Sequence, residues 1–140
     1  MISASPGFHP WFAHWISTAP HPPPKDEHYR SLFLSIDEQF GEGADSTNAT
    51  LRAFEEMLPS LPEPLSIGEC ISSLRQNFES FPRAMLGEVG LDRSARVPYD
   101  HRAEHRKLSP FTVPFDHQLI LLEAQLAVAV EVGRNVSMHR

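Results

Sequence analysis

The sequence predicts an α/β fold in which short parallel strands alternate with helices. Residues 67–78 carry apolar side chains every three or four positions, which indicates a helix, and the apolar segment Ala84–Val89 that follows is typical of a strand. A long helical segment from residue 115 and a second short strand at residues 135–139 complete the pattern. Since strand–helix–strand units form right-handed crossovers, these two strands are expected to be parallel.

The helix ends have local signals of their own. Ser66 with Glu69 three residues later forms a capping box that begins a helix, which Pro82 ends. Pro114 suits the first turn of the last helix and Gly133 its end. Its apolar side is predicted to comprise Phe115, Leu119, Leu122, Leu126, Ala129 and Val130. The remaining predicted elements are a weak strand at 1–5, a proline-rich loop at 19–27, a helix at 27–36, a polar loop at 37–48 and a helix from Ser46 or Thr47 to Pro59.

Composition narrows the class of protein. The 140 residues are enough for one domain with a core, and 41% hydrophobic and 21% charged residues are ordinary for a globular protein. A net charge of −6 argues against a protein that coats DNA through a basic surface, although not against an enzyme whose metal binds phosphate. The single cysteine, Cys70, falls on an apolar helical face and predicts a core thiol in a reducing compartment. No membrane span or signal peptide is evident, so we expect cytoplasm or nucleus.

Glu88 is the first candidate for a functional residue. It interrupts an apolar strand, where an ionised carboxylate is costly unless it is paired or bound to a metal. At the carboxyl end of a parallel strand it would instead lie where α/β folds keep their chemistry. His139 ends the second strand at the same edge, so the two side chains are predicted to share one divalent metal ion. The alternative is a strand-end glutamate that points into solvent.

Other polar residues have weaker signals. The charged segment Gly90–Pro110 is predicted to be a loop, solvated or placed as a locally basic mouth for an anionic substrate. His101 and His105 lie four residues apart, but no helical pattern supports a metal pair there. His9 lies in an aromatic loop, where packing is commoner than ligation, and His14 and His21 are expected on the surface.

Three motifs resemble, in order and spacing, those of the TatD-type metal-dependent deoxyribonucleases. They are Gly7–Pro10 (Gly-Phe-His-Pro), Leu86–Asp92 (Leu-Gly-Glu-Val-Gly-Leu-Asp) and Val136–His139 (Val-Ser-Met-His). The form Gly-Phe-His-Pro-Trp-Phe and the proline- and histidine-rich insertion after it resemble most the fungal branch, whose members are named as interactors of an anaphase-promoting-complex subunit.

This resemblance implies a (β/α)8 barrel of the amidohydrolase group in which a metal-activated water cleaves phosphodiesters. Glu88 and His139 would be ligands of a divalent ion such as Mg²⁺, Zn²⁺ or Mn²⁺. His9 would lie near the pocket without ligating, and Asp92 would support the ligands. Nucleic acid would be the substrate, a cell-cycle protein a possible partner, and no membrane is implied.

The sequence departs from the family pattern in what it lacks. No His-x-His pair precedes Gly7, and the family's later histidine and aspartate ligands would lie beyond Arg140. Residues 1–140 are therefore interpreted as a partial TatD-like domain holding about strands 2 to 4 of the barrel, a fragment not expected to be an active nuclease alone. Two alternatives stay open: a non-enzymatic interaction protein that binds a cell-cycle regulatory partner, and another α/β metal enzyme that acts on a small molecule.

Overall fold

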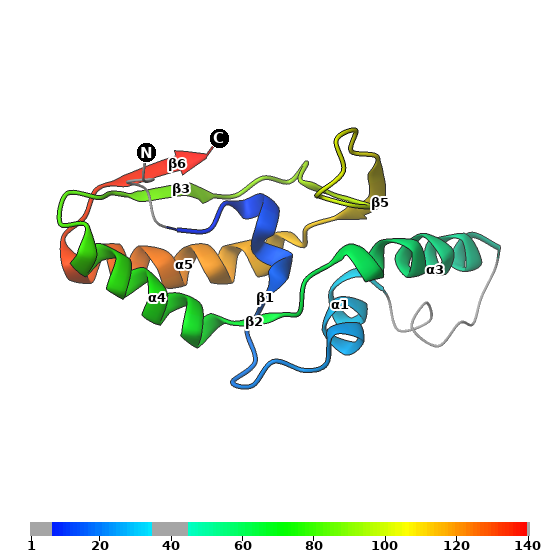
Figure 1. Cartoon of the computed structure of the whole chain (residues 1–140), viewed down its shortest axis with the longest axis horizontal. Coiled ribbons are helices and arrows are strands. Elements are labelled where there is room, and N and C mark those ends of the chain that lie inside the picture. The colour runs from blue at the N-terminus through cyan, green and yellow to red at the C-terminus, as the bar shows by residue number, and fades with distance from the viewer. Residues whose placement is uncertain (1–6, 35–44, 140) are drawn as a thin grey trace.

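The computed structural model describes residues 7–34 and 45–139 as helices joined by short strands and loops (Figure 1). In chain order the elements are the 3₁₀ helix η1 (Pro10–Trp15), β1 (Ile16–Ser17), α1 (Lys25–Phe33), α3 (Asp45–Met57), the 3₁₀ helix η2 (Leu58–Ser60), β2 (Leu65–Ser66), α4 (Ile67–Ser80), β3 (Leu86–Gly90), β4 (Arg96–Pro98), β5 (Leu108–Thr112), α5 (Phe115–Val132) and β6 (Val136–His139). Mixed helix and strand confirm the predicted α/β class. The strand predicted at residues 1–5 and most of the polar loop at 37–48 lie outside the described residues.

Strand pairing is parallel where the crossover predicted it. β3 pairs with β6 in parallel, and α5 connects them along the chain. Figure 1 shows these two strands side by side, with α5 and α4 on one face of the pair. β1 also pairs in parallel with β2, while β4 and β5 form an antiparallel hairpin. Within the described ranges each sheet therefore has two strands.

The predicted ends of α4 and α5 are confirmed. The Ser66 hydroxyl accepts a hydrogen bond from the Glu69 backbone N–H at 3.4 Å, as a capping residue does. Gly133 follows α5 in the left-handed conformation, with φ +69°, which suits glycine at this position. Both ends were predictable because a few neighbouring residues determine them.

The buried apolar residues form two clusters, and α5 contributes to both. The larger contains residues from η1, α1, α3 and the β4–β5 hairpin, and it includes Cys70, which is buried as predicted. The smaller joins α4, α5 and β3, and its members are Leu74, Phe78, Ala84, Leu86, Val89, Leu122, Val128 and Ala129. No described helix is both long enough and apolar enough to cross a membrane.

The predicted apolar side of α5 is partly wrong. Leu119 is 37% exposed and Val130 is 81% exposed, whereas Gln118 and Gln125 are buried. Because this helix is apolar on nearly all sides, periodicity does not decide which face is covered. The buried face is the one whose glutamines find backbone partners.

The segment Gly90–Pro110 is not a simple loop. It contains β4 and most of β5, with Val97 and Phe111 buried in the larger cluster. In β5 the burial alternates strictly along the strand, so its period of two is real. The buried position Ser109 is polar and the exposed position Leu108 is apolar, so polarity along the sequence does not reveal this pattern.

Arg134, just after α5, forms hydrogen bonds with the end of α4 and with the segment that leads into β3. Its guanidinium donates hydrogen bonds to three carbonyl oxygens, those of Phe78 at 2.7 Å, Phe81 at 3.0 Å and Ala84 at 2.9 Å. It also lies 4.9 Å from the centre of the Phe78 ring, at cation–π distance. One side chain thus satisfies carbonyls that the end of a helix leaves without partners.

Arg134→Ala is expected to lower the free energy of unfolding by about 1–2 kcal/mol, since several charge-assisted hydrogen bonds are lost at a partly exposed site. Urea denaturation monitored by circular dichroism measures this change. Arg75→Ala, which removes an exposed ion pair with Glu131, is the matched control and should cost less than about 0.5 kcal/mol. Equal losses in both variants would contradict the role given to Arg134.

Candidate metal centre

Glu88 lies on a bulge of β3. Leu86 pairs with Val136 and Val89 pairs with Met138, so β3 has one more residue than β6 between these pairs. A bulge bends its strand and redirects the side chain that it carries. The residues on both sides of Glu88 are buried, while its own side chain is 48% exposed. The extra residue therefore turns this carboxylate out of the packed strand.

His139 meets Glu88 because the ends of β3 and β6 approach closely. Gly90 lies opposite His139, with φ +145°, and a Cβ on Gly90 would come within 2.8 Å of the His139 carbonyl oxygen. Only glycine permits this approach. Nδ1 of His139 lies 3.7 Å from Oε1 of Glu88. The structure thus brings together the two side chains that the sequence predicted to be ligands.

Asp92 supports His139. Its Oδ2 accepts hydrogen bonds from the Trp11 indole N–H at 2.7 Å and from Nε2 of His139 at 3.0 Å. Its Oδ1 accepts from the Ser94 hydroxyl at 2.6 Å and from the Ser94 backbone N–H at 2.9 Å. The hydrogen bond from the Ser94 side chain, which has the largest effect, and the one from Trp11 hold the pKa of the Asp92 carboxyl far below its usual value. Asp92 is therefore an acceptor only.

These contacts assign the proton of the His139 ring. Because ionised Asp92 accepts, Nε2 of His139 must carry the hydrogen in that bond. In the tautomer that this bond selects, the lone pair is on Nδ1, the ring atom that lies 3.7 Å from Oε1 of Glu88. A carboxylate that fixes the tautomer of a histidine in this way is the usual support of a metal ligand.

His9 lies on the other side of Glu88. Its Nε2 is 3.4 Å from Oε1 of Glu88, and its ring centre is 4.5 Å from that of His139. Its Nδ1 accepts a hydrogen bond from the Trp11 backbone N–H at 3.2 Å, which caps η1. The pKa of His9 is lowered mainly by burial and, to a smaller extent, by the neighbouring His139. The neutral ring then carries its hydrogen on Nε2, facing Glu88, as a donor and not as a ligand.

Two buried glutamines on α5 hold the loops that carry the site. The Gln118 side chain accepts from the Asp92 backbone N–H at 2.7 Å and donates to the carbonyls of Asp92 and Val113, both at 3.0 Å. Gln125 accepts from the Phe8 backbone N–H at 2.7 Å, next to His9. Both segments are thus fastened to one helix.

The three side chains together form a place for a cation. Ligand atoms of His9, Glu88 and His139 lie within 4.8 Å of one another. Among them, the Glu88 carboxylate and Nδ1 of His139 are free to donate electron pairs, a ligand chemistry that suits a divalent ion. The donor set therefore fits a metal through two ligands, fewer than the three protein ligands usual for a catalytic zinc site.

Sequence reasoning missed Trp11, Gln118, Gln125 and the buried His14. The Trp11 bond to Asp92 spans 81 positions and has no local signal. The two glutamines, seven residues apart on an apolar helix, did offer one, because buried polar side chains at helical spacing indicate backbone partners. His14, expected on the surface, is 2% exposed, while His21 is exposed as predicted.

A carboxylate–imidazole cluster at the carboxyl ends of two parallel strands is the arrangement found in α/β proteins that bind a ligand or metal at that edge. The chain is 31% identical over 144 residues to the Cut9-interacting protein scn1 of Schizosaccharomyces pombe. It is 24% identical over 136 residues to the uncharacterized deoxyribonuclease YMR262W of Saccharomyces cerevisiae. Each alignment covers 95% of this chain and 38% of the relative.

The chain is therefore a homologue of both proteins, in agreement with the TatD-type deoxyribonuclease family that its motifs resemble. It spans well under half the length of these curated relatives. No protein-family model matches it, and no solved structure does either.

Proposed function

We propose that the chain carries part of the metal centre of a TatD-like hydrolase, with Glu88 and His139 as ligands of one divalent ion. The observation that supports this most directly is the His139 ring, whose Nε2 donates to Asp92 and whose Nδ1 lies 3.7 Å from the Glu88 carboxylate. Two side chains from different strands thus offer electron pairs to one point.

In this proposal each residue has a separate task. Glu88 and His139 hold the ion, Asp92 fixes the ring of His139, and His9 donates a hydrogen bond that orients the Glu88 carboxylate. A bound divalent ion would polarise a phosphodiester and lower the pKa of water. Further ligands would have to come from segments that residues 1–140 do not supply.

We place this domain as a segment of a (β/α)8 barrel. The parallel β3–α5–β6 unit supports this placement, because that barrel is built from such units and has its active site at the carboxyl ends of the strands. Exposed apolar side chains on α5, among them Leu119, Ile120 and Val130, would then pack against neighbouring helices. Nucleic acid is the proposed substrate, by analogy with the deoxyribonuclease named above.

Metal binding by the 140-residue chain tests the proposal. Titration with Mn²⁺, followed by calorimetry, is expected to show saturable binding, and excess EDTA should reverse it. Because an ion that binds only the folded state stabilises it, the Tm should rise with Mn²⁺ concentration. A chain that binds no Mn²⁺ at millimolar concentration and shows no change in Tm would overturn the assignment.

The second candidate function is that of an interaction protein. The name of the S. pombe relative, which describes it as interacting with Cut9, favours this reading, as does the small number of ligands. It would gain support if Mn²⁺ failed to bind while the chain folded cooperatively. The two functions differ in this one measurement.

A further inference from the structure

A cavity of about 210 Å³ opens beside the candidate metal centre, between η1 and the β4–β5 hairpin. Asp92 and Trp11 belong both to its wall and to the support of His139. The cavity is thus next to the place where a phosphate would meet the proposed metal. We call it the aromatic cavity.

Aromatic rings form much of its wall. Trp15 lies with its ring centre 4.6 Å from that of Phe12 and 5.0 Å from that of His101, and all three line the cavity together with Trp11. Its volume corresponds to about seven water molecules and is below the roughly 300 Å³ at which sites for whole drug-sized ligands begin. The space therefore suits one planar ring system.

Two buried nitrogen atoms in this wall have no partner in the described part of the chain. They are Nε1 of Trp15, a donor, and Nδ1 of His14. His14 is 2% exposed, and burial lowers its pKa to about 3, so its ring is neutral at neutral pH. Since buried polar groups are normally paired, these two atoms leave hydrogen-bonding capacity unused beside the cavity.

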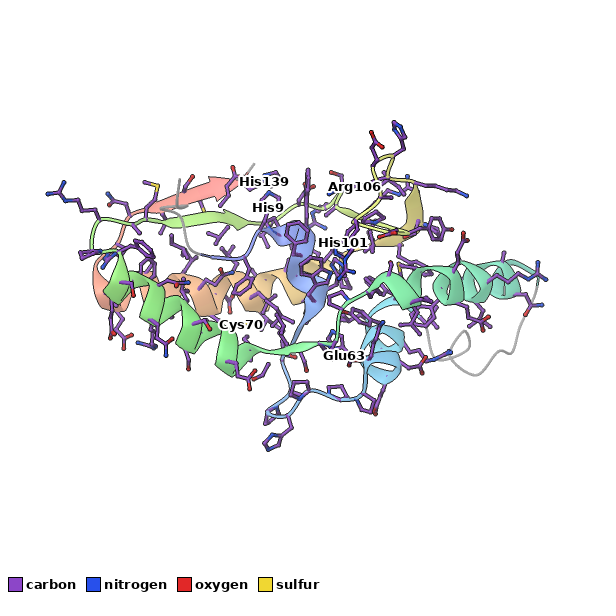
Figure 2. The ribbon with its side chains drawn as sticks, in the orientation of Figure 1. His9, Glu63, Cys70, His101, Arg106 and His139 are labelled. Atoms are coloured by element: carbon purple, nitrogen blue, oxygen red, sulfur yellow. The ribbon has the colours of Figure 1, made fainter. Side chains whose placement is uncertain are left out.

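A free cation lies at the same cavity. The Arg106 side chain lines it, and its guanidinium forms no ion pair or hydrogen bond with residues 7–34 or 45–139. The neighbouring Arg96 is occupied, because it donates two hydrogen bonds to the Ser109 carbonyl oxygen. Figure 2 shows Arg106 and His101 in the region of the β4–β5 hairpin, and His9 and His139 near the ends of β3 and β6.

We propose that the aromatic cavity binds one base of a single-stranded nucleic acid, with Arg106 on the adjoining phosphate. Stacking on aromatic side chains accepts any base, and a guanidinium pairs well with a phosphate oxygen. The base so held would place the next phosphodiester against Glu88 and His139, a step that rests on the function proposed above. Base binding itself needs no metal.

Binding of a fluorescein-labelled single-stranded oligothymidylate, measured by anisotropy in excess EDTA, tests this inference. Arg106→Ala and Trp15→Phe are each expected to weaken binding by roughly tenfold, since they remove the phosphate contact and a base contact. Lys107→Ala is the matched control, because it removes the same charge one residue away, from a side chain that lies over the Tyr99 ring. It should change binding less than about twofold.

Competition separates the ligand chemistry. Unlabelled thymidine should displace the probe, while inorganic phosphate at the same concentration should not. Equal effects of Arg106→Ala and Lys107→Ala, or no displacement by thymidine, would overturn the inference. Because anisotropy in excess EDTA reports base binding without metal, while Mn²⁺ calorimetry reports metal binding without the probe, loss of metal binding and loss of base binding are told apart.

Discussion

Glu88→Gln is expected to lower the affinity of the chain for Mn²⁺ by about 100-fold or more. Glutamine has the shape of glutamate but no charge, and the change leaves two imidazole rings beside a neutral amide. Loss of groups that only support metal ligands costs about 10- to 100-fold in affinity, so loss of an anionic ligand should cost at least as much. Calorimetric titration measures both affinities.

The control for this change is Glu79→Gln. Glu79 is an exposed carboxylate of α4, outside the cluster of possible ligands, so its loss changes net charge equally. We expect its Mn²⁺ affinity to equal that of the unaltered chain within about twofold. If Glu88→Gln behaves in the same way, Glu88 is no ligand, and β3 ends in a carboxylate that only accepts a hydrogen bond from His9.

Acidification from pH 7 to pH 5 is expected to lower the free energy of unfolding by about 2 kcal/mol through His14 alone. Burial lowers the pKa of His14 from 6.5 to about 3 in the folded chain. As the pH falls, the unfolded state therefore binds a proton near pH 6.5, whereas the folded state binds it only near pH 3. The free energy of unfolding decreases throughout that interval. His28 and His117 act in the same direction, because burial lowers the pKa of each.

Urea denaturation at the two pH values measures this loss. His14→Leu should reduce the difference between them by about 2 kcal/mol, since leucine has no proton to bind. His21→Leu, at an exposed position of the proline-rich loop, should leave the difference unchanged. A His14→Leu variant that keeps the whole pH dependence would show that other groups cause it.

Much of the fold and part of the site could be predicted from the sequence. The ends of α4 and α5 depend on Ser66, Pro114 and Gly133, and the parallel pairing of β3 and β6 follows from their order along the chain. Glu88 and His139 were found because each interrupts or ends a strand at one edge.

What escaped prediction depends on partners far away in the chain. Three polar side chains are buried, those of His14, Gln118 and Gln125. The glutamines accept hydrogen bonds from backbone groups far away in the sequence, at Asp92 and Phe8. The β4–β5 hairpin was hidden because β5 buries the polar Ser109 while it exposes Leu108, and because β4 has only three residues. Local patterns contain no information on such tertiary contacts.

The two glutamines give α5 the role of a spacer between the loops of the site. They are seven residues apart, which is nearly two full turns, so both side chains leave the same face about 10 Å from each other along the axis. The separation between the loop of His9 and the loop of Asp92 is thus determined by the rise of a helix, which is the same in all proteins. Inserting one residue between Gln118 and Gln125 would rotate one glutamine by about 100° and detach its loop, although no residue of the centre would have changed. The alignment of the centre is therefore encoded in the length of a helix segment that contributes none of its three side chains.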